Sequence, residues 1–178
     1  MTTYYMVECD FPFPEEREGF DQFYNGHITM LLTIKGFVSA QRFECVHAAR
    51  APFLAVYELT DPAVMTSPAY TSKAGPTSVS ETYRPKMKNW DRNLMTSVDP
   101  VTINVPLGGW LALIDRKVDA APALPAEFAS LRSEGLDKTL VERGVLTGEG
   151  EPSALGEGDG VTRVVRTFRA LHPIRYPQ

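Results

Sequence analysis

Hydrophobic and polar positions in the first hundred residues predict strands that alternate with helices. Residues 4–9 (YYMVEC) are aromatic and β-branched, as is typical of a strand, and the prolines that follow end it because they lack a backbone donor. A helix comes next and ends at Lys35–Gly36. At about 100° per residue, its large side chains gather within about 60° of one line and include a single histidine. This stripe consists of Phe20, Phe23, Tyr24, His27, Leu31 and Ile34.

The next elements complete a recognisable order. Residues 37–46 and 53–59 predict two strands whose short connection suits an antiparallel hairpin. Residues 61–65 predict a short capped helix that Ser67–Pro68 ends, residues 71–89 a polar loop with a partial helix, and residues 90–98 a fourth strand. The order β-α-β-β-α-β is ferredoxin-like, an α+β fold with an antiparallel sheet and helices on one face.

The second half repeats this theme in shorter form. Residues 109–118 predict a strand, and residues 126–143 predict a helix with Gly144 at its C-cap. Strands at 145–147 and 161–171 flank the glycine-rich segment 148–160, which we interpret as a flexible hairpin tip. We therefore expect two fused repeats, 1–99 and 100–178, that meet near Asp99–Pro100.

Composition excludes several classes of protein. The chain has 178 residues, 43% of them hydrophobic, and 18 basic against 22 acidic residues give a net charge of −4. This charge provides no electrostatic footprint for nucleic acid or for anionic lipid. No apolar run approaches the roughly 20 residues that span a bilayer, and the first residues lack the layout of a signal peptide. We expect a globular, cytoplasmic protein without a disulfide between Cys9 and Cys45.

His27 is the best catalytic candidate. An imidazole titrates near neutrality, which suits proton transfer, and Tyr24 lies one turn earlier on the same stripe. Tyr24 could bind a substrate oxygen or orient the imidazole. The alternative is that both side chains are ordinary parts of an amphipathic core.

Other side chains are candidates for substrate binding. Arg42 alternates with Gln41 on its strand, so one of the two faces inward; an inward Arg42 could bind a carboxylate or enolate. The alternative is an edge-strand arginine in solvent or paired with Glu44 or Glu58. The remaining candidates are aromatic, either as phenolic donors or as a wall: Phe23, Tyr57, Tyr83, Trp90 and Trp110.

The sequence does not predict a metal site or a cofactor site. His47 in a hairpin turn and His172 before a proline are expected in solvent, and His27 with Glu8 would supply only two ligands. Phosphate-binding, dinucleotide-binding and nucleophile-elbow motifs do not occur. We expect neither metal nor cofactor.

Several segments resemble the EthD-like branch of the dimeric α+β barrel superfamily. They are Phe23–His27 (FYNGH), Lys35–Phe37 (KGF), Ala40–Phe43 (AQRF) and Ser67–Tyr70 (SPAY). The likeness covers about the first half. It departs from the family pattern at Thr29 and Lys35, where the family carries proline.

The resemblance implies a barrel closed by a homodimer or within an internal pseudo-dimer, with His27 facing a cleft between sheet and helix. Together with the residues it suggests a cofactor-independent lyase, cyclase or isomerase acting on an aromatic or carbonyl substrate. His27 would be the general acid or base and Tyr24 would hold the oxyanion. The alternatives are a non-catalytic ligand-binding or accessory protein, and a monooxygenase on the same fold.

Overall fold

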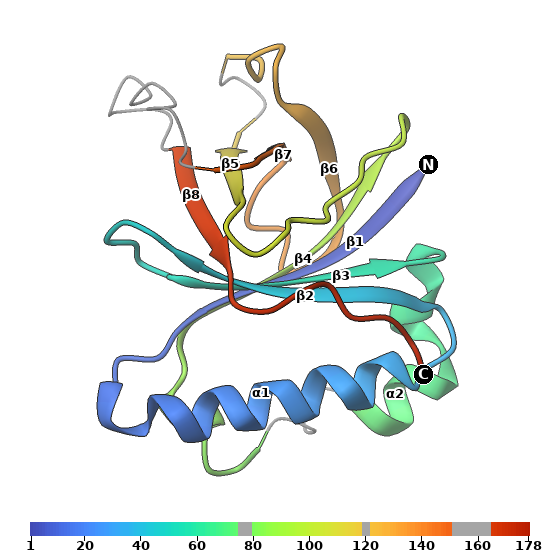
Figure 1. The fold of residues 1–178 in the computed structure, drawn as a ribbon. Helices are drawn as coiled ribbons and strands as arrows, with labels where there is room; N and C mark the ends of the chain where they lie inside the picture. Colours follow the sequence, from blue (N-terminus) through green and yellow to red (C-terminus); the bar gives the residue numbers. More distant parts are fainter. Residues whose placement is uncertain (75–79, 119–121, 151–164) are drawn as a thin grey trace.

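The computed structural model describes residues 1–74, 80–118, 122–150 and 165–178. Eight antiparallel strands form a closed barrel in the order β1-β3-β2-β8-β5-β7-β6-β4 (Figure 1). The strands are β1 (Thr2–Asp10), β2 (Phe37–Cys45), β3 (Phe53–Leu59), β4 (Lys88–Ser97), β5 (Trp110–Arg116), β6 (Ala129–Leu136), β7 (Glu142–Gly148) and β8 (Val165–Ala170). No helix in the described part is long and apolar enough to cross a membrane.

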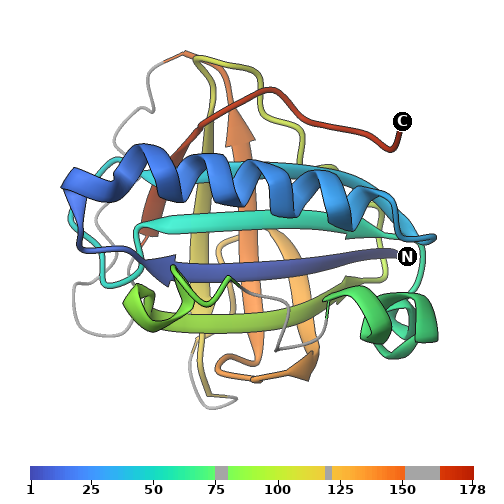
Figure 2. The same ribbon diagram turned by 90° about the horizontal axis from the view of Figure 1, so that it is seen from below.

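The first half has the predicted element order. Its strands follow the order β4-β1-β3-β2, and the helices α1 (Arg17–Leu32) and α2 (Pro68–Ala74) lie on one face of this sheet. Figure 2 shows α1 running alongside the strands of the first half. The predicted strand bounds are confirmed to within a few residues, and the main helix ends before Gly36 as expected.

The predicted short helix, capped by Asp61 and ended by Ser67–Pro68, is confirmed. Residues 62–66 form a short 3₁₀ turn capped by Asp61, but α2 starts directly at Pro68. The Ser67 hydroxyl accepts a hydrogen bond from the Tyr70 amide, as an N-cap does, and proline is favoured in the first helical turn. Ser67 and Pro68 therefore end one helix and begin the next, which the sequence did not predict.

The predicted helix at residues 126–143 is wrong. This segment contains β6 and the start of β7, joined by a turn with positive φ at Leu136 and Lys138. β6 pairs with β4 on one side and with β7 on the other, so it closes the barrel. Most of segment 148–160 and the start of the predicted strand 161–171 lie outside the described residues.

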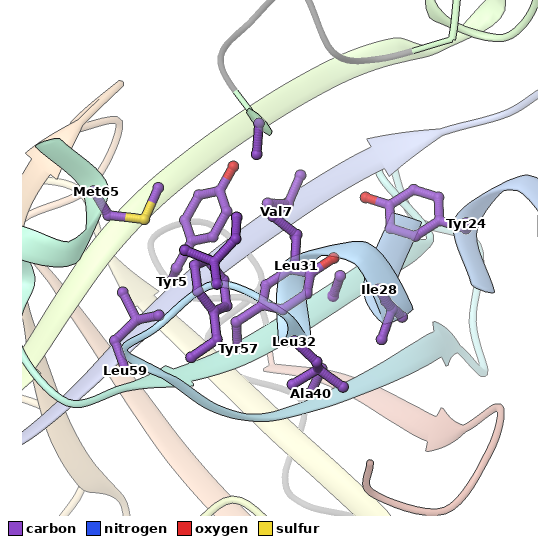
Figure 3. Packing of buried hydrophobic residues seen from close by; sticks show 14 of the residues in the cluster. Tyr5, Val7, Tyr24, Ile28, Leu31, Leu32, Ala40, Tyr57, Leu59 and Met65 are labelled. Atoms are coloured by element: carbon purple, nitrogen blue, oxygen red, sulfur yellow. The ribbon is translucent and has the colours of Figure 1, made fainter. Parts of the chain in front are cut away.

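The sheet is buried on both faces, which separates two hydrophobic cores. Along β1, Tyr5, Val7 and Cys9 pack toward the helices, whereas Tyr4 and Met6 point into the barrel. Figure 3 shows the core between sheet and helices, where Ile28, Leu31 and Leu32 of α1 meet β1, β2 and β3. The candidate site lies in this outer core.

Candidate functional site

A small pocket lies between α1 and the sheet. It is lined by Tyr5, Val7, Phe23, Tyr24, His27, Tyr57, Met87 and Trp90. Five predicted site residues therefore meet here, from α1, β3 and β4. The cavity measures about 20 Å³, room for about one water molecule, so a ring-shaped ligand requires side chains at its mouth to move. Phe23, His27 and Trp90 are only partly buried and are placed to do so.

The geometry of α1 and of the sheet brings these side chains together. The His27 ring lies 6.0 Å from the Phe23 ring and 6.0 Å from the Tyr24 ring, since all three lie on one helix face. Opposite them, Tyr5 and Tyr57 are direct cross-strand partners and stack with ring centres 5.5 Å apart. Sequence analysis missed Tyr5, Val7 and Met87 as lining residues.

His27 is a neutral imidazole in aromatic surroundings. Burial lowers its pKa from 6.5 to about 4, so the ring carries no charge at neutral pH. Within the described part of the chain, neither a hydrogen bond nor an ion pair reaches this ring. A neutral imidazole has one free lone pair, and His27 can therefore accept a proton from a bound molecule.

The pocket tyrosines are neutral phenols. Burial raises the pKa of Tyr24 and of Tyr57 well above the ordinary value, while the nearby positive charge of Arg42 opposes the rise. Figure 3 shows the hydroxyl groups of Tyr24 and Tyr57 pointing toward one another from α1 and β3. Burial, and after it the neighbouring Tyr70, raise the pKa of Tyr5.

Arg42 is neither in solvent nor paired with Glu44 or Glu58. It is 2% exposed and faces α1, where its Nη2 lies 2.9 Å from Asp21 Oδ1 in an ion pair that lacks hydrogen-bond geometry. Its guanidinium carbon lies 4.4 Å from the centre of the Tyr24 ring. The edge-strand alternative is wrong because β8 pairs with β2 and leaves no free edge. Arg42 thus supports the pocket wall without lining it.

The aromatic wall differs from the predicted one. Tyr83 does not line the pocket but stacks on Phe23, with ring centres 5.3 Å apart. Trp110 belongs to a separate core cluster on β5, so it forms no wall with Trp90.

The remaining charged and histidine candidates lie elsewhere. Glu8 points into the barrel and pairs with Arg143, on the opposite face from His27, so the two could not share a metal ion. His47 is exposed as expected, whereas His172 is half-buried rather than in solvent. The described residues contain no group of three His, Cys, Asp or Glu side chains placed to hold a metal. Cys9 and Cys45 are free thiols on strands that β3 separates.

Comparison with known proteins gives the fold. No protein-family profile and no curated protein matches the sequence. A proposed monooxygenase from Lactobacillus acidophilus NCFM superposes with a TM-score of 0.58 at 10% identity, over 99% of this chain and 97% of that one. An anthrone oxidase-like protein superposes with a TM-score of 0.61 at 9% identity, over 99% and 93% of the chains.

A third solved structure agrees. A proposed chlorite dismutase superposes with a TM-score of 0.55 at 8% identity, over 97% of this chain and 96% of that one. These likenesses confirm the predicted α+β fold with an antiparallel sheet. At such low identities they concern the fold and not the reaction.

Proposed function

We propose that this protein is an enzyme that removes a proton from a small, flat aromatic carbonyl or phenolic compound, with His27 as the proton acceptor. The observation that carries the proposal is the state of the His27 ring, which is neutral, free of hydrogen bonds and part of an aromatic pocket. The aromatic side chains of the pocket can pack against a flat apolar ligand, and the His27 ring provides one nitrogen that can accept a proton from it.

The chemistry begins at an acidic C–H group next to the conjugated ring system. A nitrogen of His27 takes the proton, and the electron pair of the C–H bond moves into the ring system and onto the carbonyl oxygen. A phenol hydroxyl of the pocket, Tyr24 or Tyr57, donates a hydrogen bond to that oxygen as its charge grows. The product of this step is an enolate or phenolate next to a protonated histidine.

We propose dioxygen as the second substrate. The carbanion reduces dioxygen and forms a C–O bond; His27 returns its proton to give a hydroperoxide, and loss of water leaves a ketone. In sum, a CH₂ group and O₂ give C=O and H₂O. We choose dioxygen by analogy with the names of two structural neighbours, a proposed monooxygenase and an anthrone oxidase-like protein. A lyase, cyclase or isomerase reaction would use the same first step and no oxygen.

A haem-dependent reaction does not fit these residues. Ile28, Leu31 and Tyr24 of α1 pack directly onto the sheet and are nearly fully buried, so the space beside His27 is filled. The cavity itself holds about one water molecule. We therefore derive no step through a haem group.

The test uses anthrone, which has a CH₂ group between two aromatic rings and opposite a carbonyl. With the wild-type protein in aerobic buffer, an oxygen electrode should record one O₂ consumed for each quinone that forms. His27→Ala should lower the rate by at least about 100-fold, the usual contribution of a general base. His47→Ala removes an exposed histidine and is the matched control, with an unchanged rate.

A second readout separates proton removal from oxygenation. Without oxygen and in D₂O, the wild-type protein should catalyse exchange of the CH₂ protons of anthrone, followed by NMR. If the CH₂ protons exchange but no oxygen is consumed in air, the proposed oxygenase reaction is wrong, and a lyase or isomerase reaction is the better assignment. Binding without exchange, or a His27→Ala variant with full turnover, would show that His27 is not a catalytic base.

We also propose a relation to the EthD-like branch of the superfamily. The segments that carry the likeness lie together in the structure, since Tyr24 and His27 line the pocket and Arg42 contacts the Tyr24 ring. Tyr70, from the last of these segments, is a neighbour of the pocket residue Tyr5 and raises its pKa. All four residues thus contribute to one site.

A further inference from the structure

Two hydrogen-bond donors at the pocket have no partner within the part of the chain that the structure describes. The Tyr57 hydroxyl and the indole nitrogen of Trp90 are buried, and neither finds an acceptor among the described residues. Tyr57 is only 1% exposed as a residue, so solvent does not replace the missing partner. Unsatisfied buried polar atoms are rare and costly, and each one requires an explanation.

Both donors belong to the same cavity. Tyr57 on β3 and Trp90 on β4 flank β1 from its two sides, and both line the pocket together with His27. An indole N–H can only donate a hydrogen bond, and a phenol O–H donates to any acceptor. A ligand with acceptor oxygens could pair with both donors. An aromatic hydrocarbon would leave both of them without a hydrogen bond.

Two arginines, each paired with a carboxylate, flank this part of the pocket. Arg42, 2% exposed, lies against the Tyr24 ring, and its charge opposes the rise in the pKa of Tyr24, Tyr57 and Cys9 that burial causes. Its carboxylate partner Asp21 is 32% exposed and lies toward solvent. The guanidinium carbon of Arg92 lies 5.5 Å from the centre of the Trp90 ring, and Arg92 is paired with Asp137, which is 33% exposed. A negative ligand oxygen is favoured at this place.

We propose that the pocket selects ligands through an oxygen that carries negative charge, with the Tyr57 hydroxyl and the Trp90 indole N–H as its donors. The ligand class is therefore phenolates and enolates of flat aromatic compounds. Arg42 is a positioning residue that stabilises this charge from behind Tyr24. The inference deepens the proposed function, because the oxygen that becomes negative when His27 takes a proton would be the one these donors hold.

The test compares 2-naphthol with naphthalene, two flat probes that differ by one oxygen. Calorimetry should show 2-naphthol binding at least tenfold more tightly to the wild-type protein. In Tyr57→Phe this preference should fall by about tenfold, the contribution of a hydrogen bond to a charged oxygen. The matched control is Tyr176→Phe, which removes an exposed hydroxyl and should change nothing.

A spectroscopic readout tests the charge. Naphtholate absorbs at longer wavelength than naphthol and the protein, so a pH titration gives the pKa of the bound probe. We expect a value about one unit below that in water for the wild type and for Arg42→Lys, and no such shift for Arg42→Gln. The thermal stability of ligand-free Tyr57→Phe should equal or exceed that of the wild type, because an unpaired buried hydroxyl is removed.

The binding measurements test the donor assignment whether or not the protein turns anthrone over. Equal affinity for the two probes, no saturable binding of 2-naphthol, or an unchanged preference in Tyr57→Phe would overturn it. If 2-naphthol selectivity holds but anthrone is not deprotonated, the donors are confirmed and the proposed reaction fails. If anthrone turns over while Tyr57→Phe keeps both selectivity and rate, the reaction stands and the donor assignment fails.

Discussion

His27 shows how one partly buried side chain couples the site to the stability of the fold. In the unfolded chain its imidazole titrates near 6.5, whereas burial lowers its pKa in the folded protein to about 4. Between these values the unfolded state binds more protons, so stability falls as the pH falls. The group that can accept a proton from a ligand is therefore also an acid-sensitive point of the fold.

A replacement of His27 tests this coupling. Wild type should lose roughly 2–3 kcal/mol more unfolding free energy than His27→Leu between pH 7 and pH 4.5, since only wild type has the shifted imidazole. Urea unfolding at the two pH values measures the difference. His47→Leu alters an exposed histidine and should behave like wild type. An equal acid response of wild type and His27→Leu would contradict the buried, neutral state of His27.

At the residue scale, periodicity predicted part of the site. The helical stripe placed Phe23, Tyr24 and His27 on one face, and these residues line the pocket. Tyr5 was missed because β1 is apolar on both faces, so alternation does not show which face meets the helices. The surroundings of Arg42 depend on β8, more than a hundred residues away, which no local pattern contains.

Elements with a strong local signal were predicted best. The strands predicted from continuous apolar runs, and the helix predicted from its apolar face, are present in the structure. Segment 126–143 was predicted wrongly because Phe128 and Leu131 are three residues apart, a spacing that also fits one face of a helix. In the structure Leu131 lies in a strand paired with β4 and β7, and the pairing needs of two neighbours override the local preference.

Two glycines, one inside α1 and one in the turn that follows it, should respond in opposite ways to replacement by alanine. Gly36 has a φ of +105°, and a Cβ there would lie 2.4 Å from Val64 Cγ2, whereas Gly26 inside α1 has nothing within 4 Å. Gly36→Ala should therefore lower the unfolding free energy by more than about 1 kcal/mol. Gly26→Ala should raise it by about 0.5–1 kcal/mol, the difference in helix propensity. Thermal unfolding measures both, and a stabilising Gly36→Ala would contradict the described turn.

At the scale of the whole molecule, the two halves have the same strand order. The first half reads β4-β1-β3-β2 and the second reads β8-β5-β7-β6, which is the same order when each half is numbered from its own first strand. This correspondence supports our proposal of two fused repeats, 1–99 and 100–178, that form an internal pseudo-dimer. One chain then closes the barrel by itself, and association with a second copy would use other surfaces.

Charged side chains inside the barrel connect the halves. Glu8 of the first half and three residues of the second, Asp115, Arg143 and Arg166, form a neutral network of ion pairs. Arg143 is fully buried and lies 2.6 Å from both carboxylates. Burial would raise the pKa of Glu8 and of Asp115, but the two arginines hold both below their ordinary values. Removal of one charge would leave another uncompensated.

Arg143→Met should therefore destabilise the barrel by about 3–5 kcal/mol, the cost of breaking a buried ion pair. Arg92→Met removes one member of a partly exposed pair with Asp137 and should cost at most about 1 kcal/mol. Urea unfolding compares the two. In Arg143→Met one carboxylate favours its protonated form, so the gap to the wild type should narrow as the pH falls. Equal small losses in both variants, or a gap that widens in acid, would show that this network does not hold the halves together.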